Sequence, residues 1–176
     1  MRLRIYQQKR ALALLGERDE ERQLGEMAHL ALYFLEDYDG TPGRIEEAVS
    51  RALALYTEPL PEREKFRKRL LEVLTRALSH PEIARFFAPG IPDLREHPFV
   101  RHKGRGGEPE VHRPDRVLLL PEGPVVLEYK LHRPEDPGEH ERQVREYLSG
   151  LSLVLKQPVR GCLVYLEPPE VREVRP

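Results

Sequence analysis

Residues 114–130 read PDRVLLLPEGPVVLEYK, the most informative stretch of the chain for its fold. An apolar run at 117–120 is followed by a proline- and glycine-containing turn at 121–124 and a β-branched run at 125–130. Two such runs on either side of a tight turn predict a pair of neighbouring strands. Because the second run begins with three consecutive apolar residues, we expect a central strand that is covered on both faces.

Three of the charged residues on and beside this strand pair, Asp115, Glu128 and Lys130, are candidates for a functional site. Side chains alternate between the two faces of a strand, so we expect Glu128 and Lys130 on one face and Tyr129 on the other. Asp115 precedes the first run, and its carboxylate is expected to meet that of Glu128 across the pair. A Glu and a Lys two residues apart are also typical of an exposed, mutually screened pair. Burying such charges without a partner or a metal is costly, which favours a functional site.

The flanking sequence predicts an α/β fold with a helical first half. Apolar residues at helical spacing predict helices at about 20–37, 41–56, 66–77 and 81–87. After Pro92 we expect extended segments at 98–103 and 110–120, the strand at 125–130, a helix at 139–156, a strand at 159–166 and then a polar tail. This order predicts a single domain over residues 1–176. A helical part at about 1–92 would precede a β-β-β-α-β core at about 93–167, with a mixed central sheet of about four strands flanked by helices.

Composition narrows the class of protein. The chain of 176 residues is 39 % apolar and 34 % charged, which is typical of a soluble globular protein. Its apolar runs fall far short of the ~20 residues that span a membrane, and no secretory signal follows the start, so we expect a cytoplasmic protein. The single cysteine, Cys162, excludes an internal disulfide and a four-cysteine metal site. High charge and 17 prolines favour a thermophile source.

Two carboxylates and a lysine in this arrangement suit phosphodiester hydrolysis. That reaction needs an activated water and a cation that neutralises the charge building on the phosphoryl oxygens. Mg²⁺ supplies both and prefers carboxylate ligands. A lysine nearby can orient the water or stabilise the developing charge.

The motifs around these residues resemble a known family. Residues 114–115, a spacer of twelve and residues 128–130 match the PD-(D/E)XK signature of restriction-endonuclease-like nucleases. Residues 25–29 and 143–147 are similar to the G-x-x-x-H and Q-x-x-x-Y helix motifs of the RecB-like nuclease domains of helicase–nucleases, and residues 161–166 resemble their last core strand. The resemblance implies a restriction-endonuclease-like core.

The resemblance also implies the roles of the site residues. A Mg²⁺ or Mn²⁺ ion is implied, with an imidazole, two carboxylates and a backbone carbonyl as ligands: those of His29, Asp115, Glu128 and Tyr129. Lys130 would position the attacking water, while Gln143 and Tyr147, which share a helix face, would support the site or contact the scissile strand. Taken alone, His29 would be read as a packed or capping residue. Gln143 and Tyr147 equally fit an ordinary surface Gln and core Tyr.

The activity implied by the resemblance is metal-dependent hydrolysis of DNA, in repair or recombination, with a helicase subunit or domain as partner. The chain has no Gly-x-x-x-x-Gly-Lys-Ser/Thr segment, so we expect no ATP binding by this chain. Two alternatives stay open. One is a catalytically silent nuclease-fold module that binds DNA or a partner protein, and the other is an RNA-directed nuclease with the same catalytic residues.

Further charged residues lie near the predicted site in the sequence. Glu96 is an additional acidic candidate. Basic residues surround the glycine-rich turn and flank the aspartate: Arg101, His102, Lys103, Arg105, Arg113 and Arg116. Such a cluster suits contacts with phosphates, and it equally suits an ordinary solvated hairpin.

Overall fold

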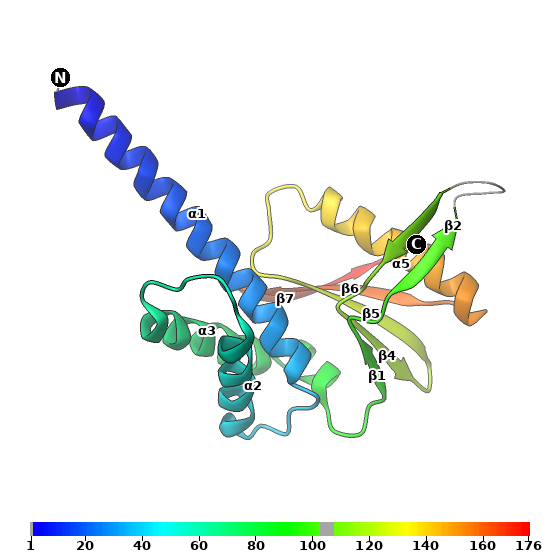
Figure 1. Cartoon of the computed structure of the whole chain (residues 1–176). Coiled ribbons are helices and arrows are strands. Elements are labelled where there is room, and N and C mark those ends of the chain that lie inside the picture. Colours follow the sequence, from blue (N-terminus) through cyan, green and yellow to red (C-terminus); the bar gives the residue numbers. More distant parts are fainter. Residues whose placement is uncertain (1, 103–107) are drawn as a thin grey trace.

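The computed structural model describes residues 2–102 and 108–176. The helices are α1 (Arg2–Phe34), α2 (Pro42–Leu55), α3 (Arg63–Leu78), α4 (Pro81–Ala84), the 3₁₀ helix η1 (Arg85–Phe87) and α5 (Gly138–Leu155). The strands are β1 (Asp93–Arg95), β2 (Phe99–His102), β3 (Pro109–His112), β4 (Arg116–Leu120), β5 (Gly123–Lys130), β6 (Arg160–Leu166) and β7 (Pro169–Val174). The helices α1–α4 and η1 come first, and the strands follow with one more helix, α5, between β5 and β6 (Figure 1).

The predicted fold class is confirmed, because helices precede a mixed sheet of an α/β fold. Five strands pair in the order β1-β4-β5-β6-β7, and β2 and β3 form a separate two-stranded sheet. β5 and β6 run parallel, joined through α5, and the other neighbours in the large sheet run antiparallel. β5 lies in the centre of the sheet, and its six inner residues are buried. The apolar run at 125–127 therefore marks a doubly covered strand, as expected.

Helices cover both faces of the large sheet (Figure 1). The face towards α1–α4 forms one apolar core with residues such as Leu127, Tyr129 and Val164. The face towards α5 forms a second core around Val126, Leu163 and Tyr165. Because side chains alternate along β5, Glu128 and Lys130 project on the α5 side, while Tyr129 projects towards the helical half.

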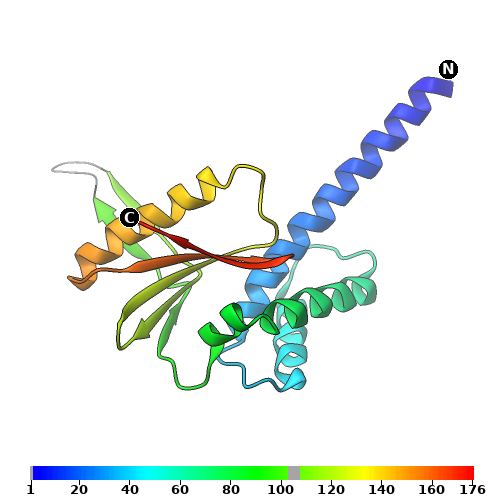
Figure 2. The ribbon, with the colours of Figure 1, turned by 180° about the vertical axis from the view of Figure 1, so that it is seen from behind.

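Helix α1 is longer than the sequence predicted. It begins at Arg2, not near residue 20, and its first part extends away from the rest of the chain in both views (Figures 1 and 2). Residues 2–15 contain no glycine or proline and are rich in Leu, Ala, Arg and Gln, which favour helix, so the helix continues beyond the segment with a buried face. No helix in residues 2–102 and 108–176 is both long and apolar enough to cross a membrane.

Two predictions about the strands were wrong. The segment 110–120 is not one extended strand: β3 pairs with β2, and β4 pairs with β1 and β5 in the other sheet. Pro114, which has no backbone N–H to give to a ladder, stands between them. The expected polar tail contains β7, which pairs antiparallel with β6 and lies at one edge of the sheet (Figure 2). An edge strand that buries few side chains has no strong alternation of apolar and polar residues, so its sequence does not predict a strand.

Candidate functional site

Asp115 and Glu128 lie opposite each other just beyond the last pair of the β4–β5 ladder. Arg116 pairs with Leu127 in the β4–β5 ladder, so the preceding Asp115 lies beside the following Glu128. The Asp115 carboxylate accepts a hydrogen bond from the backbone N–H of Tyr129, with 2.7 Å between Oδ2 and N. The register therefore places the two residues opposite each other, and the charge of Asp115 acts on Glu128.

Helix α1 brings His29 to the same place. Its Nε2 lies 3.2 Å from Oδ2 of Asp115, and its Nδ1 lies 2.8 Å from the carbonyl oxygen of Gly25. Because a carbonyl can only accept, Nδ1 carries the proton that it donates to Gly25, and Nε2 is the nitrogen that faces the acidic group. The spacing of Gly25 and His29 thus fixes the ring orientation through one turn of helix.

The charge of His29 depends on its neighbour. Burial by itself lowers the pKa of His29, but the hydrogen bond and charge of Asp115, assisted by the Gly25 carbonyl and Glu128, raise it to about 9. In the metal-free protein at neutral pH, His29 is therefore a cation paired with Asp115. Losing the Nε2 proton would expose a lone pair of the kind that binds transition metals.

On the α5 side, four polar side chains form a continuous chain. Lys130 Nζ lies 3.0 Å from Glu128 Oε1 and 3.0 Å from Gln143 Oε1. Gln143 Nε2 donates in turn to the Tyr147 hydroxyl at 2.8 Å. The helical spacing of Gln143 and Tyr147 places both on the face of α5 that meets β5. The alternative of a core Tyr is also met, because Tyr147 is buried in the second apolar core, while Gln143 is half-buried and contacts both Lys130 and Tyr147.

Among the contacts of the described residues, this arrangement leaves hydrogen-bond donors of Lys130 and Tyr147 unused. An ammonium group has three N–H donors, and Lys130 spends two of them on Glu128 and Gln143. Burial, followed by the charge of Glu128, raises the pKa of Tyr147 to about 12, so its hydroxyl keeps its proton. Lys130 is 22 % exposed, so its third donor can reach a molecule that enters from solvent.

Among the charged residues of this site, Glu128 lies in the least favourable environment for its charge. The residue is 4 % exposed, and its Oε2 makes no hydrogen bond to any part of the chain that the structure describes. Burial, followed by the charge of Asp115, raises the pKa of Glu128 to about 7. A buried carboxylate oxygen without a partner beside a second carboxylate is an environment that a hard divalent cation would satisfy.

The donor types fit Mg²⁺ or Mn²⁺, but the side chains are not yet gathered around one point. Among residues 2–102 and 108–176, no three His, Cys, Asp or Glu side chains lie close enough together to hold a metal ion. His29 contacts Asp115, while Glu128 turns to Lys130. A metal ion held by all three side chains would require them to reorient. The Tyr129 carbonyl stays a predicted ligand, and the Tyr129 ring faces the helical half.

Glu96 belongs to the same acidic row. Its backbone N–H donates to the Asp115 carbonyl at 3.0 Å, which continues the β1–β4 ladder by one position. Glu96 has φ of 49°, a left-handed backbone conformation that is rare for a non-glycine residue and is often found at functional sites. Burial, followed by the charge of Asp115, raises its pKa. Glu96 directly follows β1, Asp115 directly precedes β4, and Glu128 lies on β5, so the three come from neighbouring positions in the sheet.

The predicted basic cluster is only partly at the site. Arg116 is buried against the helical half and cannot grip phosphates, because its side chain lies on the opposite side of the sheet from the polar cluster. Arg113 is exposed and lies 3.8 Å from Glu96. Lys103 and Arg105 lie outside the described residues, as does the side chain of His102.

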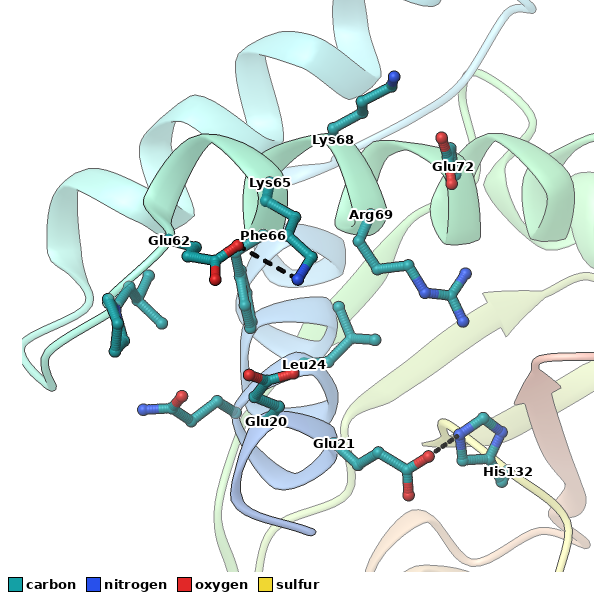
Figure 3. A pocket seen from close by; sticks show the side chains of 13 residues that line it. Glu20, Glu21, Leu24, Glu62, Lys65, Phe66, Lys68, Arg69, Glu72 and His132 are labelled. Atoms are coloured by element: carbon teal, nitrogen blue, oxygen red, sulfur yellow. Dashed lines mark ion pairs between the residues drawn. The ribbon is translucent and has the colours of Figure 1, made fainter. Parts of the chain in front are cut away.

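A separate cavity of about 540 Å³ lies between α1 and α3 (Figure 3). Apolar Leu24 and Phe66 line it together with charged side chains of both signs, and the His132 imidazole lies 3.6 Å from the Glu21 carboxylate at one side. None of the residues of the polar cluster lines this cavity. Its mixed charge gives no reason to connect it with the chemistry of the cluster.

Comparisons with known proteins add little to this geometry. No protein-family model matches the sequence, and no curated protein matches it. Among solved structures, the crystal structure of SSO0001 resembles the chain at 18 % sequence identity and a TM-score of 0.41, over 72 % of this chain and 72 % of that one. A likeness of this strength transfers no property from that protein to this one.

Proposed function

We propose that the chain is a divalent-metal-dependent deoxyribonuclease with a restriction-endonuclease-like core. The observation that carries the proposal is a group of polar side chains on adjacent elements, in which a buried carboxylate lies between an aspartate and a lysine and has one oxygen without a hydrogen bond among the described residues. Its side chains come from α1, from the start of β4, from β5 and from α5: His29, Asp115, Glu128, Lys130, Gln143 and Tyr147. The resemblance of the sequence to RecB-like nucleases supports the same assignment.

In this proposal some residues bind the metal ion and Lys130 positions the water or the phosphoryl group. Asp115, Glu128 and His29 would hold Mg²⁺ or Mn²⁺, which when bound supplies an acidified water and neutralises charge on the phosphoryl group. Lys130, held between Glu128 and Gln143, directs its remaining donor towards the attacking water or a phosphoryl oxygen. Because its position is fixed before substrate arrives, little reorganisation is needed during reaction.

DNA is the proposed substrate, in repair or recombination, with a helicase subunit or domain as a proposed partner. RNA would meet the same catalytic groups, because its backbone contains the same phosphodiester. The whole chain, residues 1–176, is proposed to act as one nuclease domain. The silent binding module is the second candidate, and what favours it is the metal-free geometry, in which the acidic side chains do not converge.

Cleavage of labelled single- and double-stranded DNA and RNA tests the proposal. Native protein, Lys130→Ala and Lys65→Ala are compared with Mg²⁺, with Mn²⁺ and with EDTA. Lys65 lies on α3 with 74 % of its side chain exposed, so it controls for the loss of a positive charge. We expect metal-dependent DNA cleavage that Lys130→Ala lowers by at least ~100-fold, in keeping with the loss of one positioned charge-stabilising group.

Other results would point elsewhere. Equal cleavage by native protein and Lys130→Ala would indicate a contaminant and overturn the role of Lys130. Faster cleavage of RNA would change the substrate class. If none of the nucleic acids is cut, Mn²⁺ titration of native protein against Asp115→Asn decides the matter. Binding that depends on Asp115, with no cleavage, would favour the silent module.

A further inference from the structure

Arg116 is a buried cation beside the proposed site that has no part in the chemistry described above. It is 2 % exposed, and its Nε lies 2.6 Å from Oδ2 of Asp93 on β1. Its guanidinium carbon lies 4.6 Å from the centre of the Phe87 ring. A buried ion pair contributes little net stability compared with apolar side chains of the same volume. The directional contacts of Arg116 are therefore more informative than its charge.

Those contacts fix the end of α1. The helix ends at Phe34, and carbonyl groups at and just beyond a helix end have no partner within the helix. Arg116 donates to the carbonyl oxygen of Leu35, at 3.1 Å, and to that of Glu36. A cation at this end also interacts favourably with the helix dipole. Arg116 thus ties the carboxyl end of α1 to β4.

The two elements joined in this way carry the two groups that meet in the site. His29 stands five residues before the end of α1, and Asp115 is the immediate neighbour of Arg116 along the chain. A stacked pair of rings completes the link: Phe87, beneath the guanidinium, lies 6.2 Å from the Tyr129 ring, which lies 6.1 Å edge-on from His29. A shift of α1 along the sheet would move His29 relative to both.

We infer that Arg116 is a positioning residue, which holds α1 in register with β4 so that the His29 imidazole lies over the Asp115 carboxylate. The geometric part concerns the metal-free chain alone. The consequence for metal binding rests on the proposed function. Arg116 itself touches neither metal nor substrate.

The first test measures the geometry and needs no metal. Nuclear Overhauser contacts between the His29 and Tyr129 rings are compared in native protein, Arg116→Lys and Arg116→Met. A lysine keeps the charge near Asp93 but cannot reach both carbonyls, and methionine removes all polar contacts while Arg95, 3.3 Å from Asp93, still neutralises it. We expect both variants to fold and to lose the ring contacts. A folded variant with unchanged contacts would overturn the inference.

The second test measures how the positioning of His29 by Arg116 affects the affinity for Mn²⁺. Mn²⁺ affinity is measured by calorimetry. We expect Arg116→Lys to lower it about tenfold, which is the lower end of the loss in metal affinity when a group that orients a ligand is removed. In a His29→Ala background the same substitution should change affinity by less than about twofold, because its effect runs through His29. Equal losses in both backgrounds would show that Arg116 acts on the fold in general, and would overturn the inference.

A matched control separates this effect from the loss of any arginine. Arg160→Met removes a half-exposed arginine at the start of β6 that contacts Glu122, far from the α1–β4 junction. It should leave both the ring contacts and Mn²⁺ affinity unchanged. If native protein binds Mn²⁺ no better than Asp115→Asn, the proposed function fails, and the ring contacts still decide the role of Arg116.

Discussion

Replacing Glu128 with glutamine is expected to stabilise the metal-free protein above neutral pH. The carboxylate is buried, and burial followed by the charge of Asp115 raises its pKa from 4.5 to about 7. Because the folded value lies above the unfolded one, the stability contributed by the protonated form is complete below pH 4.5. It is lost as the pH rises through 7. Glutamine has the same shape but no charge, so the variant escapes this loss.

The magnitude follows from the size of this pKa difference. At ~1.4 kcal/mol for each pH unit, the interval from 4.5 to 7 is worth about 3 kcal/mol. Lys130, 3.0 Å away, can still donate to the amide oxygen of the glutamine, so the lost ion pair offsets little of the stabilisation. We therefore expect Glu128→Gln to raise the free energy of unfolding by about 1–3 kcal/mol at about pH 8, and by much less at about pH 5.

Urea unfolding with EDTA at both pH values, followed by circular dichroism, measures this difference. Glu122→Gln is the control, since Glu122 is exposed on the turn between β4 and β5, and it should change stability by less than about 0.5 kcal/mol. A Glu128→Gln variant that is no more stable than native protein at about pH 8 would refute the reasoning. Adding Mn²⁺ should reverse the order, because only the carboxylate gains a ligand bond.

Three further substitutions test other parts of the structure. His29→Gln should lower the free energy of unfolding of metal-free protein by about 1–2 kcal/mol at pH 6, a value reduced for solvent screening of a 29 % exposed side chain. That loss should fade as the pH rises through 9, where the native imidazole itself loses its proton, and urea unfolding at the two pH values would show it. Gly161→Ala should destabilise by about 1–3 kcal/mol in thermal unfolding, because a Cβ there would lie 2.6 Å from a methyl carbon of Val144. Gly43→Ala, with open space around it, should not. Glu96→Gln should weaken Mn²⁺ binding several-fold in calorimetry, and unchanged affinity would remove Glu96 from the metal site.

The strand pair at 116–130 and its charges were predictable because their signals are local. Consecutive apolar residues predict a buried strand. The alternation of side chains between the two faces of a strand assigns Glu128 and Lys130 to one face. The spacing of Gln143 and Tyr147 likewise places both on one side of a helix. The sequence could thus name these residues, and the roles proposed for them stay predictions.

Other features follow from tertiary contacts between distant segments. Local sequence patterns did not show that His29 reaches Asp115, 86 positions later, because no such pattern sets how a helix packs on a sheet; only the family resemblance placed both residues in one site. The sequence equally could not distinguish the exposed Arg113 from the buried Arg116, three residues apart. Both are arginines beside the motif, and only the elements packed above each one decide whether it faces solvent or the carboxyl end of α1.

The alternation of side chains along β5 is a property of the chain itself, and so the sequence determined which groups share a face. Distances between groups on different elements depend on how the apolar faces of two helices, or of a helix and a sheet, pack against each other. The closeness of His29 to Asp115, the unpartnered oxygen of Glu128 and the pairing of β7 with β6 belong to this second kind. Only the folded structure decides them, because each needs two segments that no short-range pattern connects.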